Sequence, residues 1–265
     1  MALIHTHFFS RVLGTRTACD VVLPQRKAAC RRADEPWPVL WMLHGAGDDE
    51  TSWARNTSIE RYVAQYGLAV VFPMAHLSRY ADMVHGPRYF TYIADELPAI
   101  MRDMFPLSDK REDNLIAGAS MGGVGSLRIG LSRPENYRAI GCFSAGFSNY
   151  KLHHAVAPDP RRDKQFRLAF GDVDLSGLDD QTVCLANELI RKNAAAPAIY
   201  HTCGSEDYLL NNAHEVRRFF ESIPGNPFHY TYEEYSGEHK WPYWDRHVLD
   251  FLQWLKLPKR DGYLE

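Results

Sequence analysis

The sequence lacks the features that mark membrane, nucleic-acid-binding and disulfide-rich proteins. Its 30 Lys and Arg residues nearly balance 33 Asp and Glu residues, and the net charge of −3 gives no electrostatic case for nucleic acid or an anionic membrane. The apolar run 68–75 is far shorter than the ~20 residues of a membrane span. The N-terminus has no basic start followed by a long apolar region, so we expect no secretion signal.

Cysteine is scarce and scattered. The five cysteines are an odd number and form no CxxC pair. This pattern favours reduced thiols over a disulfide framework, and we therefore expect a cytoplasmic protein. Two histidines at His5 and His7 alternate along one predicted strand, but without a third acidic or sulfur ligand nearby they make a poor metal site, so we expect no metal.

Short apolar segments alternate with amphipathic ones along the chain. The apolar segments are rich in Val and Leu, which is typical of parallel strands covered on both faces. They are residues 38–43, 67–73, 114–120, 137–145, 198–204 and 228–235. Helical spacing of apolar residues recurs at 58–67 and 244–255. The alternation predicts an α/β fold with a mostly parallel, doubly wound sheet in one domain, 1–265.

Three segments depart from this pattern. Residues 4–14 and 17–24 predict an antiparallel pair at one edge of the sheet. Residues 147–181 fit neither the helical nor the strand period, and we expect a small cap-like insertion over the carboxyl edge of the sheet, where such sheets bind ligands. Pro98 is unfavourable inside a helix, so either a helix begins near it or a helix is kinked there.

A serine between two glycines follows the strand 114–118. Gly118, Ser120 and Gly122 form a G-x-S-x-G motif, and the stretch after them has helical character. A nucleophile elbow requires this context, because its sharp strand-to-helix turn leaves no room for larger neighbours. A tight turn with a passive serine is the alternative. The context favours Ser120 as a nucleophile.

A serine nucleophile needs a base and an orienting acid, which follow it in the order acid, then histidine, in this kind of sheet. Asp207 lies just past the predicted strand 198–204, with Glu206 as its rival. Adjacent side chains point apart, so only one can serve, and we favour Asp207. His239 lies on the loop after the last strand and is the expected base.

Acyl transfer also needs two donors for the oxyanion. The N–H of Met121, directly after the nucleophile, is the expected first donor. The second is expected from the glycine-rich loop after strand 38–43, where we assign the N–H of Ala46. A phosphate-binding loop is the alternative, but no G-x-G-x-x-G or Gly-Lys-Ser follows.

These motifs and others along nearly the whole chain resemble the esterase D family of α/β-hydrolases, which includes S-formylglutathione hydrolases and short-chain, tributyrin-type carboxylesterases. The matching stretches are "FFSRVLG", "LHGAGDDETSW", "TSIERYVAQYGLAVVFP", "SRYADM", "ELPAIMRDMFP", "GASMGG", "CGSEDYLL" and "GEHKWPYW". The resemblance implies an α/β-hydrolase fold and a serine hydrolase without cofactor. Its triad maps to Ser120, Asp207 and His239, and its oxyanion donors map to Ala46 and Met121.

The expected function is therefore hydrolysis of short-chain carboxylic esters through an acyl-enzyme. The loop after His44 carries Gly47-Asp48 in place of the Thr-Cys pair typical of the glutathione thioester branch, which leaves S-formylglutathione hydrolysis as the alternative enzyme. A catalytically silent binding protein is the alternative from another class. We expect a small ester as the partner, with a homo-oligomer left open. Candidate substrate contacts are Tyr80, Met83 and Trp241, with Asp82 at the rim.

Overall fold

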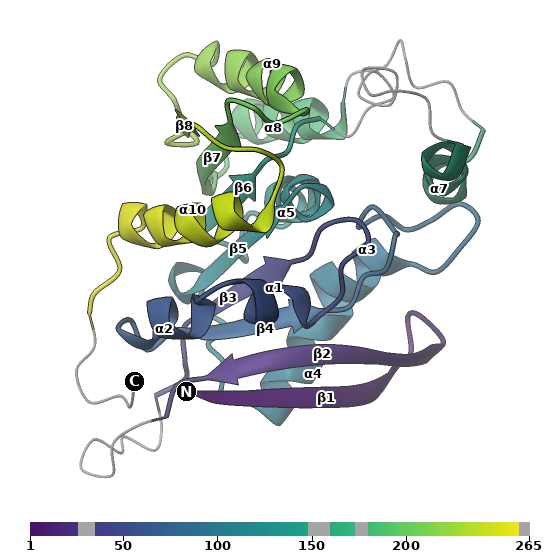
Figure 1. Cartoon of the computed structure of the whole chain (residues 1–265), viewed down its shortest axis with the longest axis vertical. Helices are drawn as coiled ribbons and strands as arrows, with labels where there is room; N and C mark the ends of the chain where they lie inside the picture. The colour runs from purple at the N-terminus through teal and green to yellow at the C-terminus, as the bar shows by residue number, and fades with distance from the viewer. Residues whose placement is uncertain (26–34, 148–159, 173–179, 260–265) are drawn as a thin grey trace.

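The computed structural model describes residues 1–25, 35–147, 160–172 and 180–259. Its centre is an eight-stranded sheet in the order β1-β2-β4-β3-β5-β6-β7-β8 (Figure 1). The strands are β1 (Ala2–Ser10), β2 (Thr15–Leu23), β3 (Val39–Leu43), β4 (Ala69–Pro73), β5 (Asn114–Ala119), β6 (Ala139–Phe143), β7 (Ala198–Gly204) and β8 (Thr231–Tyr235). Strands β3 to β8 are parallel, and β1 and β2 form the antiparallel edge. The predicted fold class is confirmed.

Helices cover both faces of this sheet. The helices of the described residues are α1 (Ser52–Asn56), α2 (Ile59–Ala64), α3 (Tyr89–Thr91), α4 (Leu97–Met104), α5 (Met121–Ser132), α7 (Pro160–Phe170), α8 (Gln181–Arg191), α9 (Leu210–Glu221) and α10 (Trp241–Trp254). Figure 1 shows α1, α2 and α10 on one face and α4 on the other. A 3₁₀ turn, Arg111–Asp113, precedes β5.

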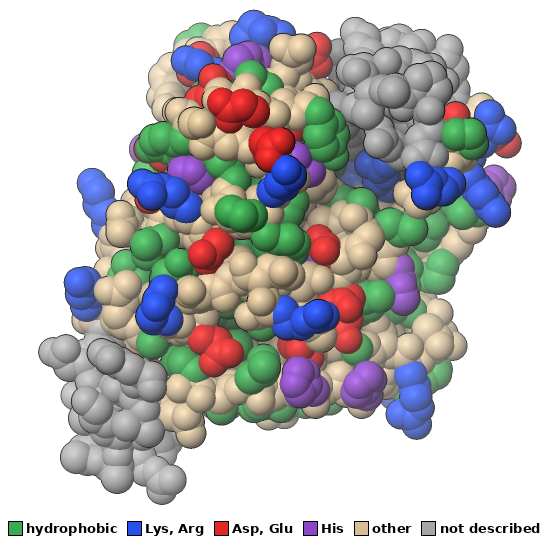
Figure 2. Space-filling view, viewed as in Figure 1, with side chains coloured by type: hydrophobic (Ala, Val, Ile, Leu, Met, Phe, Trp, Pro, Cys, Tyr) green, Lys and Arg blue, Asp and Glu red, His purple; other side chains and the backbone are tan. Residues whose placement is uncertain are grey.

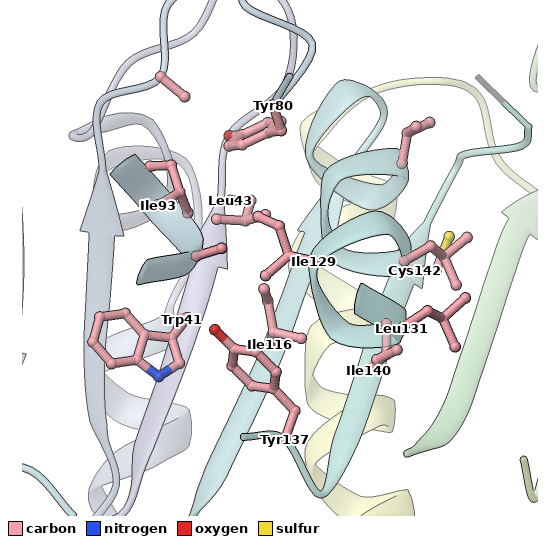
Figure 3. Close-up of a cluster of buried hydrophobic side chains, with 14 of the residues drawn as sticks. Trp41, Leu43, Tyr80, Ile93, Ile116, Ile129, Leu131, Tyr137, Ile140 and Cys142 are labelled. Carbon is pink, nitrogen blue, oxygen red and sulfur yellow. The ribbon is translucent and has the colours of Figure 1, made fainter. Parts of the chain in front are cut away.

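Two apolar cores follow from this layering. One packs Leu40 and Met42 of β3 against Trp53, Val63 and Phe251 from the helices α1, α2 and α10. The other lies across the sheet, where Figure 3 shows Trp41 and Leu43 of β3 and Ile116 of β5 beside Ile129 and Leu131 of α5. Successive side chains of a strand point to opposite faces, so one strand serves both cores.

The sequence left open whether a helix begins near Pro98 or is kinked there, and α4 begins at the residue before it. Pro98 lies in the first turn of α4 and has no N–H to donate to the helical turn before it. A π-helical turn, Tyr92–Glu96, runs directly into α4, so the helical path begins earlier and changes its pitch just before the proline.

The predicted insertion 147–181 lies largely outside the described residues. Its described helix, α7, bonds to the loop after β4: the Val84 and His85 N–H groups donate to the carbonyls of Ala169 and Leu168, at 3.0 Å each. Its placement over the carboxyl edge, and the single-domain organisation, stay predictions.

Surface charges are mixed on the face shown in Figure 2, where Lys and Arg side chains are interspersed with Asp and Glu. None of the helices in the described parts of the chain has the length and apolar character that crossing a membrane requires. Within the same residues, no cluster of three His, Cys, Asp or Glu side chains could hold a metal ion.

Candidate active site

The candidate site lies where the parallel strands end. The register pairs Leu43 of β3 with Gly118 of β5, and Ala119 of β5 with Phe143 of β6. The loops that follow β3, β5, β6, β7 and β8 therefore leave the sheet at one edge. This edge carries every predicted catalytic and oxyanion residue, as expected for a parallel α/β sheet.

Ser120 occupies the sharp turn between β5 and α5. Its φ of 56° and ψ of −118° lie in a region that non-glycine residues rarely adopt. A Cβ on Gly118 would stand 2.5 Å from the Gly122 carbonyl, and one on Gly122 would stand 2.3 Å from the Leu43 oxygen. The two glycines are therefore required by backbone packing, and the strained turn holds Ser120 out at the start of α5.

Ser120, His239 and Asp207 form one hydrogen-bonded chain. The Ser120 Oγ lies 2.9 Å from His239 Nε2, and His239 Nδ1 lies 2.8 Å from Asp207 Oδ2. The Asp207 carboxylate fixes a proton on Nδ1, which leaves Nε2 free to accept the serine proton. The structure thus brings together three residues that are far apart in sequence, in the order nucleophile, base, acid.

Asp207 is buried, with 5% of its surface exposed. Burial alone would raise the pKa of Asp207, but hydrogen bonds from His239, the Leu209 N–H and Ser144, together with the charge of His239, outweigh it and lower that pKa. Glu206 points elsewhere: it is exposed and accepts hydrogen bonds from Ser205 and the Gly237 N–H. The geometry therefore favours Asp207 over its rival as the acid.

Two residues that the sequence analysis missed support Asp207. Ser144 follows β6 in a left-handed conformation, with φ of 48°, and is fully buried. Its hydroxyl contacts Asp207 and accepts a 2.9 Å hydrogen bond from the Trp244 indole N–H. The Trp244 ring also stands edge-on to His239, with ring centroids 5.1 Å apart. The sequence did offer one signal for Ser144, since it lies at the end of a predicted strand, at the edge that carries the site.

The expected oxyanion donors lie on either side of Ser120. Met121 is the first residue of α5, where the backbone N–H has no acceptor within the helix. Ala46 is exposed on the loop after β3, and the preceding Gly45 packs against the nucleophile: a Cβ on Gly45 would stand 3.7 Å from Ser120 Cβ. The loop therefore reaches the place that a second donor must occupy, and the assignment of Ala46 and Met121 stays a proposal.

The side chains of His44 and Tyr80 fix the backbone of the loop after β3 by hydrogen bonds. The Ala75 N–H donates to His44 Nε2 at 2.9 Å, so the proton is on Nδ1, which donates to the Gly45 oxygen at 2.7 Å. Burial lowers the pKa of His44 and keeps the imidazole neutral. The Tyr80 hydroxyl donates to the His44 oxygen at 2.9 Å. Neither role is visible in the sequence pattern.

The three predicted substrate contacts have different surroundings. Tyr80 is fully buried, so the prediction that it lines the pocket is wrong: it has no surface to offer a substrate. Trp241 is half-buried and packs edge-on against Trp244, with ring centroids 5.1 Å apart. Met83 is half-buried in the loop after β4, where its side chain folds over Gly86. Trp241 and Met83 stay predictions as substrate contacts.

Comparison with known proteins identifies the family of the chain. Residues 10–255 match the sequence model of the Esterase family, which is described as "Putative esterase". The chain belongs to this esterase family. An acetyl esterase of Caldicellulosiruptor saccharolyticus is 29% identical over 96% of this chain and 98% of its own length.

Two solved structures from Staphylococcus aureus are similar throughout. The fluorophosphonate-binding serine hydrolase FphF is 28% identical with a TM-score of 0.86, and the S-formylglutathione hydrolase FrmB is 29% identical with a TM-score of 0.82. Each comparison covers 96% of this chain and 98% of the other. The predicted family and fold are confirmed. The protein is an enzyme that hydrolyses carboxylic esters, which excludes the silent binding protein, and its substrates are small esters.

Proposed function

We propose that this esterase hydrolyses short-chain acyl esters of simple alcohols through an acyl-enzyme on Ser120. The observation that carries the proposal is the hydrogen-bonded chain from the Ser120 hydroxyl through His239 to the buried Asp207 carboxylate. An unactivated serine hydroxyl is a poor nucleophile, and this chain supplies the base that it needs.

The geometry supports the following acylation step. Ser120 Oγ attacks the ester carbonyl carbon while His239 Nε2 takes the serine proton, and the N–H groups of Ala46 and Met121 stabilise the oxyanion. His239 then passes the proton to the alcohol oxygen as the C–O bond breaks. Asp207 holds the imidazole orientation and stabilises its charged form. Water repeats the attack on the acyl-serine, with His239 again as base, and the carboxylic acid leaves.

The short acyl preference is supported by the aromatic wall next to His239. Trp241 is the half-buried ring of this group, and edge contacts with the buried Trp53 and Trp244, each with ring centroids 5.1 Å away, hold it in place two residues after His239. A bulky wall shortens the space for an acyl chain. Each methylene that fits adds at most ~1 kcal/mol of differential binding, so rates rise gently with chain length and fall once the space is filled.

A second candidate function is hydrolysis of S-formylglutathione, which the likeness to FrmB of Staphylococcus aureus favours. The discriminating experiment measures kcat/KM for p-nitrophenyl esters of two to twelve carbons beside S-formylglutathione. We expect a maximum between two and four carbons. A maximum at eight carbons or more contradicts the short-chain proposal, and a formylglutathione value orders of magnitude above every ester makes the second candidate the function.

The cytoplasmic location and a homo-oligomeric state also remain proposals. The scattered cysteine pattern supports the first: the four described cysteines, Cys19, Cys142, Cys184 and Cys203, are free thiols. Size-exclusion chromatography with light scattering measures the second.

A further inference from the structure

Asp48 places a carboxylate beside the nucleophile. It closes the turn after β3, where its N–H donates to the Gly45 oxygen at 3.3 Å. The side chain folds back over Gly45: Asp48 Oδ2 lies 2.9 Å from the position of a Cβ on Gly45, and that same position is 3.7 Å from Ser120 Cβ. The carboxylate and the nucleophile therefore lie against the same glycine, in the loop that carries Ala46.

Within the part of the chain that the structure describes, few groups compensate the charge of Asp48. The Gly45 N–H favours its charge, and so does the nearby Ser52 hydroxyl, which donates its own 3.1 Å hydrogen bond to Asp49 Oδ1. Among the described residues, His239 is the basic group that acts on it favourably. The adjacent Asp49 adds a like charge. Among the salt bridges of the described residues, none joins Asp48 to a lysine or arginine.

Asp49 has a different task, although it is the next residue. Its Oδ1 accepts hydrogen bonds from the Thr51 N–H at 2.9 Å and the Thr51 hydroxyl at 2.6 Å, at the start of α1. Together with a hydrogen bond from the Ser52 hydroxyl, these bonds from Thr51 outweigh burial and lower the pKa of Asp49. Burial and then the Asp49 charge raise the pKa of Asp48. The Asp49 charge thus disfavours further negative charge in this loop, while burial disfavours a charge of either sign.

We propose that Asp48 makes this site select substrates by charge, so that neutral and cationic esters react in preference to esters that carry a carboxylate. The inference rests on the proposed function, with Ser120 as nucleophile. Two like charges ~8 Å apart at an effective dielectric constant of about 20 repel enough to change a rate at least tenfold. The glutathionyl group carries two carboxylates and one ammonium group, so Asp48 also disfavours glutathione thioesters relative to simple esters.

The test compares acetyl esters of matched phenols that differ in charge: 4-acetoxybenzoate, 4-acetoxybenzamide and 4-acetoxyphenyltrimethylammonium. The wild type and Asp48→Asn are assayed for kcat/KM with each ester at low and high salt. In Asp48→Asn we expect the ratio of anionic to neutral ester to rise about tenfold and the ratio of cationic to neutral ester to fall. Glu60→Gln on α2 removes the same charge at another surface and is expected to leave both ratios unchanged.

Two outcomes overturn the inference while leaving the proposed function intact. One is an active Asp48→Asn enzyme whose charge ratios equal those of the wild type. The other is an equal change in Glu60→Gln, which would make the effect one of net charge. If Asp48→Asn does not fold, the wild type decides: its rate with 4-acetoxybenzoate relative to 4-acetoxybenzamide is expected to rise as salt screens the repulsion, and a flat ratio contradicts the inference. A folded wild type that hydrolyses none of the three esters contradicts the proposed function itself.

Discussion

The indole N–H of Trp244 donates a 2.9 Å hydrogen bond to the hydroxyl of Ser144, 100 residues away in the sequence. Ser144 in turn contacts Asp207, so a helix on one face of the sheet is tied to the acid of the candidate triad. We infer that Ser144 is a positioning residue, which acts on the reaction through Asp207.

Ser144→Ala is expected to lower kcat by about tenfold with little change in KM, because a hydrogen bond to a charged group is worth about 1.5–3 kcal/mol. Trp244→Phe keeps a ring and removes the donor, and a smaller loss is expected. Ser126→Ala is the matched control, because its buried hydroxyl bonds the Gly123 and Gly141 oxygens away from the triad. Equal kcat losses in Ser144→Ala and Ser126→Ala would reduce the role of Ser144 to general stability.

The neighbouring acids Asp207 and Glu206 are expected to behave very differently. Asp207→Asn loses the carboxylate that orients His239, and we expect kcat to fall by about 10⁴. Glu206→Gln is expected to change kcat little, because its bonds are to Ser205 and the Gly237 N–H at the surface. Steady-state kinetics of the two variants give the ranking, and the reverse ranking would move the acid to Glu206.

The sequence was sufficient to predict the sheet and the edge at which Ser120, Asp207 and His239 meet, because both depend on local patterns. Apolar runs indicated the strands. Gly118 and Gly122 indicated the nucleophile elbow, and in the structure both are so close to neighbouring backbone atoms that a Cβ would clash. The prediction that Tyr80 lines the pocket failed for a physical reason. Arg79 and Tyr80 both adopt positive φ values, 58° and 52°, which turn the loop after β4 inward and bury the ring.

The role of Ser144 could not be predicted for a related reason. The positive φ of Ser144 and the approach of Trp244 from α10 depend on tertiary packing, which apolar periodicity does not encode. The same holds for the π-helical turn before Pro98. The prediction that a helix begins or bends near the proline came from the missing N–H alone, and the pitch of the preceding turn is set by its neighbours.

Tyr80→Phe separates a role in fastening the loop from a role in the pocket. Loss of the hydroxyl leaves the buried His44 carbonyl without this donor, and the free energy of unfolding is expected to fall by about 1 kcal/mol. The acyl-length profile is expected to stay unchanged. Trp241→Ala is the contrasting variant, in which a shift of the profile toward longer chains is expected. A shifted profile in Tyr80→Phe would return Tyr80 to the pocket wall.

Acid is expected to destabilise the fold through His201. This fully buried side chain accepts a hydrogen bond from Tyr230 and donates one to the Ala145 oxygen, and burial lowers its pKa to about 4. The unfolded histidine, with a pKa of about 6.5, binds more protons between these two values, so stability falls as the pH drops through this window. From pH 7 to pH 5 the loss attributable to His201 is about 2 kcal/mol.

Urea unfolding at pH 7 and pH 5 measures this loss, and His201→Gln should reduce the difference between the two values by that amount. His44, whose pKa is also lowered by burial, contributes in the same direction and remains in the variant. Asp207 acts in a lower window: its lowered pKa stabilises the fold above the unfolded value of about 3.9 and loses that effect in stronger acid. An unchanged difference in His201→Gln would rule out His201 as the source.

The most direct test of the account is the site of covalent labelling. The purified protein is treated with a fluorophosphonate, digested and analysed by mass spectrometry, beside Ser120→Ala. We predict one adduct, on Ser120, no adduct in the variant, and a loss of kcat in the variant that can reach ~10⁶ while its fold is retained. An adduct on another residue, or a Ser120→Ala enzyme that keeps most of its activity, would contradict it.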